Sequence, residues 1–205
     1  MALINTAIIL AGGKSLRMGF DKQLICVEGE NIIDSIIRTL KPVFKNIIVV
    51  TNKPGLYKNK DIIIAKDCYK GYGPLGGIHA GLVKSHSMYN YFIACDMPYI
   101  NVDYIKYMMK MIHENNYEPD AVITRFGDWI EPFNAFYSKK LISGIEDNMT
   151  KGKKKIGELL EDSNALYIEE KVARGFSPDW GMFTNLNTEK DLKSINTKKD
   201  RRISI

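Results

Sequence analysis

The chain has 205 residues, of which 45% are hydrophobic and 26% are charged, with a formal net charge of +5. This length suits one domain with a sizeable core, the composition is that of a soluble globular protein, and no apolar run is long enough to span a membrane. The three cysteines are odd in number and widely spaced, which favours a reducing, cytoplasmic location and argues against a zinc or disulfide framework.

Apolar strand-like runs alternate with helix-like segments along the chain. In order, the pattern predicts strands over 4–10, 47–50, 62–65, 91–95, 121–124 and 133–137, and helices over 31–40, 76–84, 102–114, 139–148, 156–161 and 188–194. Pro42 closes the first helix, and Asn101 is placed to cap the third. Alternation of this kind predicts an α/β fold with three layers, in which helices cover both faces of a mostly parallel, twisted sheet.

The two ends of the chain carry little information of their own. No basic segment precedes the apolar residues at the N-terminus, which argues against a signal peptide. Residues 196–205 are rich in lysine and arginine, and we expect a basic, flexible tail there. No aromatic-interleaved basic patch accompanies the tail, so we expect no nucleic-acid partner. The folded part is therefore expected to be a single domain over residues 1–195.

The most informative segment begins where the first predicted strand ends. Leu10-Ala11-Gly12-Gly13 is followed by a basic loop that includes Arg17 and Lys22. Glycine lacks a Cβ, so a ligand can approach its backbone closely, and cations can then neutralise phosphates. A Walker A loop would need a glycine at Ile8, and adjacent glycines do not form the Rossmann fingerprint. The segment instead matches the nucleotidyltransferase signature Leu-Ala-Gly-Gly, spacer, Arg-Met-Gly-x-x-Lys.

Polar residues follow the ends of several predicted strands. Asn52, Asp67 and Asp96 occupy such positions, as the glycine pair does. Ligands of open parallel sheets bind beyond the carboxyl ends of the strands, so we expect these residues at one rim. Asp96 directly follows a buried strand and is a good ligand for Mg²⁺, which prefers oxygen donors. The alternative is an aspartate that begins a turn before Pro98.

Other residues near the rim allow two interpretations. The glycine-rich loop 71–77 could lay backbone groups along a base or ribose, or could be a simple connector. Asp67 could be an ordinary surface carboxylate. Asn52 could bond a base edge, or only stabilise the turn before Pro54. The three histidines show no metal spacing, and we expect His79 to pack on its helix rather than act as a base.

These motifs together resemble those of the molybdenum cofactor guanylyltransferases. The likeness spans about Thr6 to Leu192 and rests on five segments, in order: Leu10–Gly13 with Arg17–Gly19 and Asp21-Lys22; Asp67 with Gly73–Gly77; Cys95–Pro98; Pro132–Tyr137; and Phe183–Thr188. The first motif is shared by many nucleotidyltransferases, and the last is the more discriminating. The chain departs from the family pattern at Glu131, where a less acidic residue, often histidine, is expected, and at Phe133 and Asn134. These departures concern the acceptor more than the nucleotide site.

The resemblance implies a nucleotide-diphospho-sugar-transferase-like, Rossmann-like fold. It also implies Mg²⁺-dependent transfer of GMP from GTP to the phosphate of molybdopterin carrying molybdenum, with release of pyrophosphate. By position, the residues assigned to GTP are Leu10, Ala11, Gly12, Gly13, Lys22, Asn52, Asp67, Gly76 and Asp96. Asp96 would also hold the metal, and Arg17, Lys22 and Asp96 would neutralise the transition state. Molybdoenzymes or their chaperones are further candidate partners.

Two classes of alternative stay open. One is another nucleotidyltransferase, either a cytidylyltransferase acting on molybdopterin or a sugar-nucleotide pyrophosphorylase. The other is a GTP-binding cofactor carrier without catalysis. For the acceptor, Asn185 and Asn187 could bond the pterin or cap the helix that begins near Thr188. The lysine-rich loop 151–155 could attract an anionic acceptor or be a solvated surface loop.

Overall fold

The computed structural model describes residues 3–12, 22–27, 29–58, 60–69, 71–187 and 191. The basic tail expected at 196–205 lies outside the described residues, and so does all but Asp191 of the helix expected at 188–194. The expected boundary of the domain at residue 195 therefore stays a prediction. Within the described part of the chain, no helix is long and apolar enough to cross a membrane.

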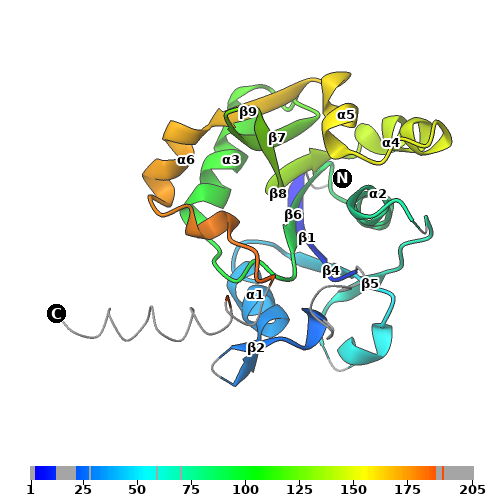
Figure 1. The fold of residues 1–205 in the computed structure, drawn as a ribbon, viewed down its shortest axis with the longest axis vertical. Helices are drawn as coiled ribbons and strands as arrows, with labels where there is room; N and C mark the ends of the chain where they lie inside the picture. Colours follow the sequence, from blue (N-terminus) through cyan, green and yellow to red (C-terminus); the bar gives the residue numbers. More distant parts are fainter. Residues whose placement is uncertain are drawn as a thin grey trace.

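A seven-stranded sheet forms the middle of the protein (Figure 1), with the strand order β5-β4-β1-β6-β8-β7-β9. The strands are β1 (Ile4–Leu10), β4 (Asn46–Val50), β5 (Ile63–Ala65), β6 (Tyr89–Ala94), β7 (Ala121–Phe126), β8 (Trp129–Ser138) and β9 (Ala165–Glu169). Strand β8 is antiparallel to β6 and β7, and the other neighbouring pairs are parallel. The predicted α/β class with a mostly parallel sheet is confirmed.

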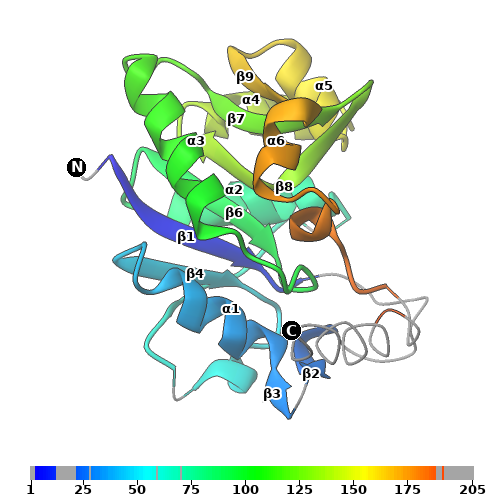
Figure 2. The same cartoon turned by 90° about the vertical axis from the view of Figure 1, so that its left-hand side faces the viewer.

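Helices cover both faces of the sheet (Figures 1 and 2). One face carries α1 (Ile32–Leu40), α3 (Val102–Glu114) and α6 (Glu170–Phe176), and the other carries α2 (Pro74–Lys84), α4 (Leu141–Thr150) and α5 (Ile156–Glu161). Side chains alternate along β1, so Ile9 packs with the first set and Ile8 with the second. The Asn101 side chain accepts a hydrogen bond from the Tyr104 amide at 2.9 Å, which confirms the predicted helix cap.

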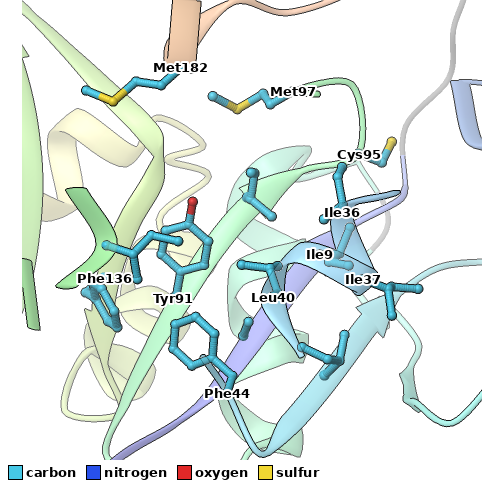
Figure 3. Packing of buried hydrophobic residues seen from close by; sticks show 14 of the residues in the cluster. Ile9, Ile36, Ile37, Leu40, Phe44, Tyr91, Cys95, Met97, Phe136 and Met182 are labelled. Carbon is cyan, nitrogen blue, oxygen red and sulfur yellow. The ribbon is translucent and has the colours of Figure 1, made fainter. Parts of the chain in front are cut away.

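The core on the α1–α3 face is closely packed with aromatic and branched side chains (Figure 3). Tyr91 of β6 packs against both Phe44 and Phe136, with ring centroids 5.6 and 5.5 Å away. All three rings are buried, and burial of one such side chain contributes roughly 1.5–3 kcal/mol. This packing holds β6, and therefore the residues that follow it, in a rigid position.

The sequence patterns miss several short elements. These are the hairpin of β2 (Cys26–Val27) and β3 (Glu30–Asn31), the strand β9, the helix α6, and the 3₁₀ turns η1 (Lys22–Leu24), η2 (Pro54–Tyr57) and η3 (Gly181–Phe183). Two-residue strands and single turns are too short to show a period of hydrophobic residues. Ala173 is the one buried residue of helix α6, so the sequence of this helix shows only a weak hydrophobic pattern.

A bulge interrupts the pairing of β7 with β8. Val122 pairs with Phe136, but the next pair is Thr124 with Glu131, so β8 holds extra residues between these pairs. Asn134 lies in this stretch with a φ of 56°, a left-handed conformation that asparagine tolerates better than most residues. Its buried side chain accepts a hydrogen bond from the Tyr91 hydroxyl at 2.7 Å. The bulge therefore changes which face of the sheet the first half of β8 presents.

Candidate active site

The carboxyl ends of four parallel strands meet at one rim of the sheet. The main chain continues the pairing past the strand ends: the Ala11 amide donates to Val50, the Cys95 amide to Leu10, and the Thr51 amide to Ala65, at 2.9 to 3.1 Å. The residues that follow β1, β4, β5 and β6 are therefore side by side. The expectation that these strands feed one rim is confirmed.

Lys22 and Asp96 form the polar centre of this rim. The Lys22 ammonium nitrogen lies 2.6 Å from Asp96 Oδ2 and 2.7 Å from the amide oxygen of Asn187. Asp96 is only 7% exposed, and its ion pair with Lys22 is partly buried. Charge-assisted hydrogen bonds of this kind are short and strong. Three segments that are far apart in the sequence thus converge on one cation.

The late Asn-Leu-Asn segment lies beside the Lys22–Asp96 pair. Its two expected roles, a bond to the pterin and a cap on the helix near Thr188, stay predictions, because residues 188–190 lie outside the described residues. The Leu186 amide donates to the Asp96 carbonyl oxygen at 2.9 Å, which sets Asn187 beside Lys22. The Asn187 amide donates to the carboxylate of Asp191 at 2.9 Å, so the side chain of Asp191 bonds back to the main chain before it. Asn185 is exposed. Of the two asparagines, the structure brings only Asn187 into the candidate site.

Asp67 and Gly76 lie together at the start of α2. A Cβ atom added to Gly76 would lie 2.8 Å from Asp67 Oδ1, so the carboxylate occupies the space that glycine leaves. The Tyr69 amide donates to the same oxygen at 2.9 Å. Burial raises the pKa of the Asp67 carboxyl, although this hydrogen bond and His79 oppose the shift. The contact between these two predicted residues places the Asp67 carboxylate next to the glycine-rich loop 71–77.

The remaining predicted residues are placed as follows. Leu10 and Ala11 are buried at the end of β1, with the Leu10 side chain 3.3 Å from a Cβ added to Gly77 of α2. Gly12 and Asn52 are exposed at the rim. Gly13 and Arg17 lie outside the described residues. Their expected contacts with GTP and with the transition state stay predictions.

Sequence reasoning missed Gln23, which is buried next to Lys22. Its side-chain oxygen accepts hydrogen bonds from the Thr51 hydroxyl at 2.7 Å and from the Tyr57 hydroxyl at 3.0 Å. Its carbonyl oxygen accepts from the Asn31 side chain at 2.9 Å. Gln23 therefore ties η1 to β4 and η2 and holds the backbone of Lys22. A lone glutamine carries no pattern that could have indicated this role.

His79 packs on its helix, as expected. It is buried, and its Nε2 lies 2.9 Å from Glu146 Oε1 of α4. The Tyr69 ring meets the imidazole edge-on, with ring centroids 4.9 Å apart. This contact fastens the loop after Asp67 to α2 and α4.

The donors at the rim suit a magnesium ion that arrives with a nucleotide. Among the described residues, no group of three or more His, Cys, Asp or Glu side chains could hold a metal ion. The carboxylate of Asp96 and the amide oxygen of Asn187 do hold one cation between them, the Lys22 ammonium. Mg²⁺ is usually bound by one or two carboxylates together with waters and substrate phosphates. The oxygens present fit that mode rather than a permanent all-protein cage.

Comparison with known proteins identifies the family of this chain. The family model described as "MobA-like NTP transferase domain" matches residues 7–166, which is most of the chain. The chain belongs to this family. The family that the sequence motifs resemble is thereby confirmed.

Curated relatives and a solved structure support the family assignment. A probable molybdenum cofactor guanylyltransferase of Peptoclostridium acidaminophilum is 47% identical over 194 residues, covering 93% of this chain and 88% of the relative. A molybdenum cofactor guanylyltransferase of Syntrophotalea carbinolica is 48% identical over 189 residues, covering 92% and 89%. The crystal structure of molybdopterin-guanine dinucleotide biosynthesis protein A from Archaeoglobus fulgidus superposes with a TM-score of 0.81 at 27% identity, over 94% of this chain and 99% of that one.

More distant structures show the same fold. A 4-diphosphocytidyl-2C-methyl-D-erythritol synthase from Anaerococcus prevotii superposes with a TM-score of 0.69 at 16% identity, over 97% of this chain and 96% of that one. The nucleotidyltransferase architecture of the family is therefore the fold of this chain. The fold expected from the family resemblance is confirmed.

Proposed function

We propose that this protein is a molybdenum cofactor guanylyltransferase, which transfers GMP from GTP to the phosphate of molybdopterin carrying molybdenum. Relatives with this name are 47% and 48% identical over nearly the whole chain. The observation that carries the proposal is the Lys22 ammonium, held by Asp96 and Asn187 at the rim where β1 and β6 end. A cation between oxygen ligands at a strand rim is suited to phosphates.

The proposed reaction joins two phosphates. An oxygen of the acceptor phosphate attacks the α-phosphorus of GTP, the bond from that phosphorus to the bridging oxygen of the β-phosphate breaks, and pyrophosphate leaves with the electron pair. A phosphate nucleophile is already ionised at neutral pH, so the reaction hardly needs a general base. Positioning and neutralisation of negative charge then supply most of the catalysis. Lys22 is the described residue best placed to neutralise the transferred phosphate, and Arg17 is proposed to assist.

We also propose that Mg²⁺ accompanies GTP. Asp96 would hold the ion, with the amide oxygen of Asn187 as a second donor, and a bound Mg²⁺ supplies positive charge to the phosphates. Because Lys22 contacts the same carboxylate, its position is set by the residue that would hold the metal. The remaining proposed nucleotide contacts follow β1, β4 and β5: the backbone of Leu10–Gly13, the side chains of Asn52 and Asp67, and Gly76.

A nucleotide panel tests the proposal. Purified protein is incubated with Mg²⁺, molybdopterin and either GTP, CTP, ATP or UTP, and pyrophosphate release and the melting temperature are measured. A site that pairs its polar groups with one base discriminates strongly against others. GTP should give the fastest release and the largest rise in melting temperature. Preference for CTP would favour the cytidylyl alternative, and nucleotide binding without pyrophosphate release would favour a carrier.

A further inference from the structure

A second polar and aromatic cluster lies beside the rim, on the far side of β6 from the residues proposed for GTP. It consists of Glu131 on β8 and Trp180, which precedes η3. The Trp180 indole nitrogen donates to Glu131 Oε1 at 3.4 Å. Figure 2 shows η3, in orange, beneath β8 on the face that carries α3 and α6. The nucleotide and metal roles proposed above use neither residue.

The bulge of β8 explains why Glu131 faces this cluster. Residues paired across an antiparallel ladder point to the same side of the sheet, and Glu131 pairs with Thr124. The Thr124 hydroxyl hydrogen-bonds the Tyr104 hydroxyl of α3. Glu131 is therefore directed to the α3–α6 face. The buried Asn134, bonded to Tyr91 and to the carbonyl of Met182, fixes this geometry.

The Glu131 carboxylate can accept more hydrogen bonds than the described residues donate to it. It is half-buried, and burial raises its pKa while the hydrogen bond from Trp180 opposes that shift. In the described part of the chain, no lysine, arginine or histidine forms an ion pair with it, and the long contact from Trp180 is its one hydrogen bond. An ionised carboxylate offers about four acceptor sites. Such a group is suited to a ligand that brings N–H donors.

Trp180 supplies a rigid aromatic surface next to the carboxylate. Its ring centroid lies 4.7 Å from that of Phe183 and 5.3 Å from that of Phe126. The Arg174 guanidinium lies 4.9 Å from the Trp180 ring centroid. The backbone of Trp180 is left-handed, with a φ of 60°, which the following η3 turn holds. A carboxylate beside an aromatic plane suits a flat heterocycle with N–H groups on one edge.

One short segment links this cluster to the reacting centre. From Trp180 the chain passes through η3 to Leu186, bonded to the Asp96 carbonyl, and to Asn187, bonded to Lys22. Seven residues span at most about 25 Å when extended, and η3 makes the separation smaller. Asp96 follows β6. In the sheet, β6 has β1, β4 and β5, whose ends carry the residues proposed for GTP, on one side and β8 on the other. A substrate with a phosphate at one end and a ring at the other could therefore reach from Lys22 to Glu131.

We infer that Glu131 and Trp180 form the subsite for the pterin ring of the acceptor, an inference that rests on the proposed function. A pterin carries a ring N–H and an exocyclic amino group side by side, and a carboxylate accepts both hydrogen bonds in a bidentate manner. The Trp180 ring provides the stacking surface. Guanine presents the same pair of donors, but the residues proposed for GTP lie across β6. The Glu131 subsite is thus assigned to the acceptor and not to the nucleotide.

The test measures pterin binding directly. The Trp129→Phe variant leaves Trp180 as the single tryptophan, because the chain has two, and Trp129 is 76% exposed at the β7–β8 turn. In this background, energy transfer from Trp180 to a bound pteridine reports binding of pterin, or of lumazine, which has a carbonyl in place of the 2-amino group. Glu131→Gln removes the charge and keeps the shape. Glu161→Gln, at an exposed position of α5, is the matched control.

Pterin should bind at least about tenfold more tightly than lumazine, and Glu131→Gln should abolish this difference while leaving GTP affinity unchanged. The variant should also raise the KM for molybdopterin with little change in the KM for GTP. Trp180→Leu removes the stacking ring and the energy donor together, so it is followed instead by the KM for molybdopterin, which should rise. Circular dichroism and thermal unfolding identify any variant that does not fold. If either Glu131→Gln or Trp180→Leu fails to fold, the result for the remaining variant tests the subsite.

Pterin binding that Glu131→Gln leaves unaltered, or a loss of GTP affinity instead, would overturn the subsite. This failure differs from failure of the proposed function. If wild-type protein releases pyrophosphate from GTP but the variant binds pterin normally, only the subsite is wrong. If wild-type protein shows no nucleotidyl transfer with any nucleotide, the proposed function is wrong whatever the pteridines do.

Discussion

Lys22 and Asp96 are separated by 74 positions in the sequence, yet the Lys22 ammonium lies 2.6 Å from the Asp96 carboxylate. The pair is held from both sides. Gln23 anchors the turn of Lys22, and β6 holds the loop that begins at Asp96. An ammonium and a carboxylate fixed in this way are preorganised, before any substrate binds, for the phosphate and metal ion that we propose they bind.

Asp96→Asn and Lys22→Ala should each reduce turnover by about a hundredfold or more, because each removes a charge that acts on the phosphates. Pyrophosphate release under saturating GTP and Mg²⁺ measures the effect. The surface ion pair of Lys41 with Asp61 is the control: the Asp61 side chain is 96% exposed, so Asp61→Asn should leave turnover unchanged. Near-wild-type turnover in Asp96→Asn would exclude that residue from the mechanism.

The two asparagines of the late segment should behave differently. Asn187→Ala removes a hydrogen-bond acceptor from the Lys22 ammonium, and hydrogen bonds to charged groups contribute about 1.5–3 kcal/mol. We expect at least about a tenfold loss of turnover. Asn185→Ala, on an exposed neighbour, should have little effect. Equal losses in both variants would contradict the specific role of Asn187.

Gln23→Leu should lower both stability and activity. The variant leaves the buried hydroxyl groups of Thr51 and Tyr57 without their common acceptor, which costs about 1–3 kcal/mol in unfolding free energy. It also releases the turn that positions Lys22. Gln23→Glu keeps an acceptor oxygen and should lose less stability. Chemical denaturation and pyrophosphate release measure the two effects, and an unaltered unfolding free energy in Gln23→Leu would show that Gln23 does not anchor the turn.

Gly76→Ala should weaken GTP use without unfolding the protein. The added methyl group would meet the Asp67 carboxylate at 2.8 Å and displace it, and small displacements of positioning groups reduce rates strongly. We expect the KM for GTP to rise about tenfold or more. Gly157→Ala is the matched control, because nothing lies within 4 Å of its added Cβ. A KM that is the same in both variants would remove Asp67 from the nucleotide site.

The raised pKa of Glu131 predicts how stability varies with pH. A carboxyl group whose pKa is higher in the folded state than its ordinary value of 4.5 binds more protons when the protein is folded. Its contribution to stability therefore falls as the pH rises from 4.5 through the raised pKa. The unfolding free energy of wild-type protein, relative to Glu131→Gln, should therefore decrease from pH 4.5 to neutral pH. Urea titrations at both pH values measure it, and a relative increase would contradict the direction of the shift.

Hydrophobic periodicity predicted the parallel half of the sheet and most of its helices, because these elements bury continuous apolar faces. The strand ends therefore predicted a common rim for Asp67, Asp96 and the glycine turn. Gln23 and the place of Asn187 could not be predicted. Their roles depend on tertiary contacts between segments that local patterns do not relate. The direction of Glu131 depends on a bulge, and one residue more or less reverses the face that a side chain occupies.

The bond from the Leu186 amide to the Asp96 carbonyl has a consequence for the boundary of the catalytic unit. The family model matches residues 7–166, but the candidate centre is completed by the segment that ends at Asn187. A polypeptide truncated at residue 166 would keep Lys22 and Asp96, yet would lose the Leu186 bond to the Asp96 carbonyl and the Asn187 oxygen that contacts Lys22. We therefore expect the smallest active polypeptide to be longer than the part that the family model matches, because the segment up to Asn187 completes the candidate centre.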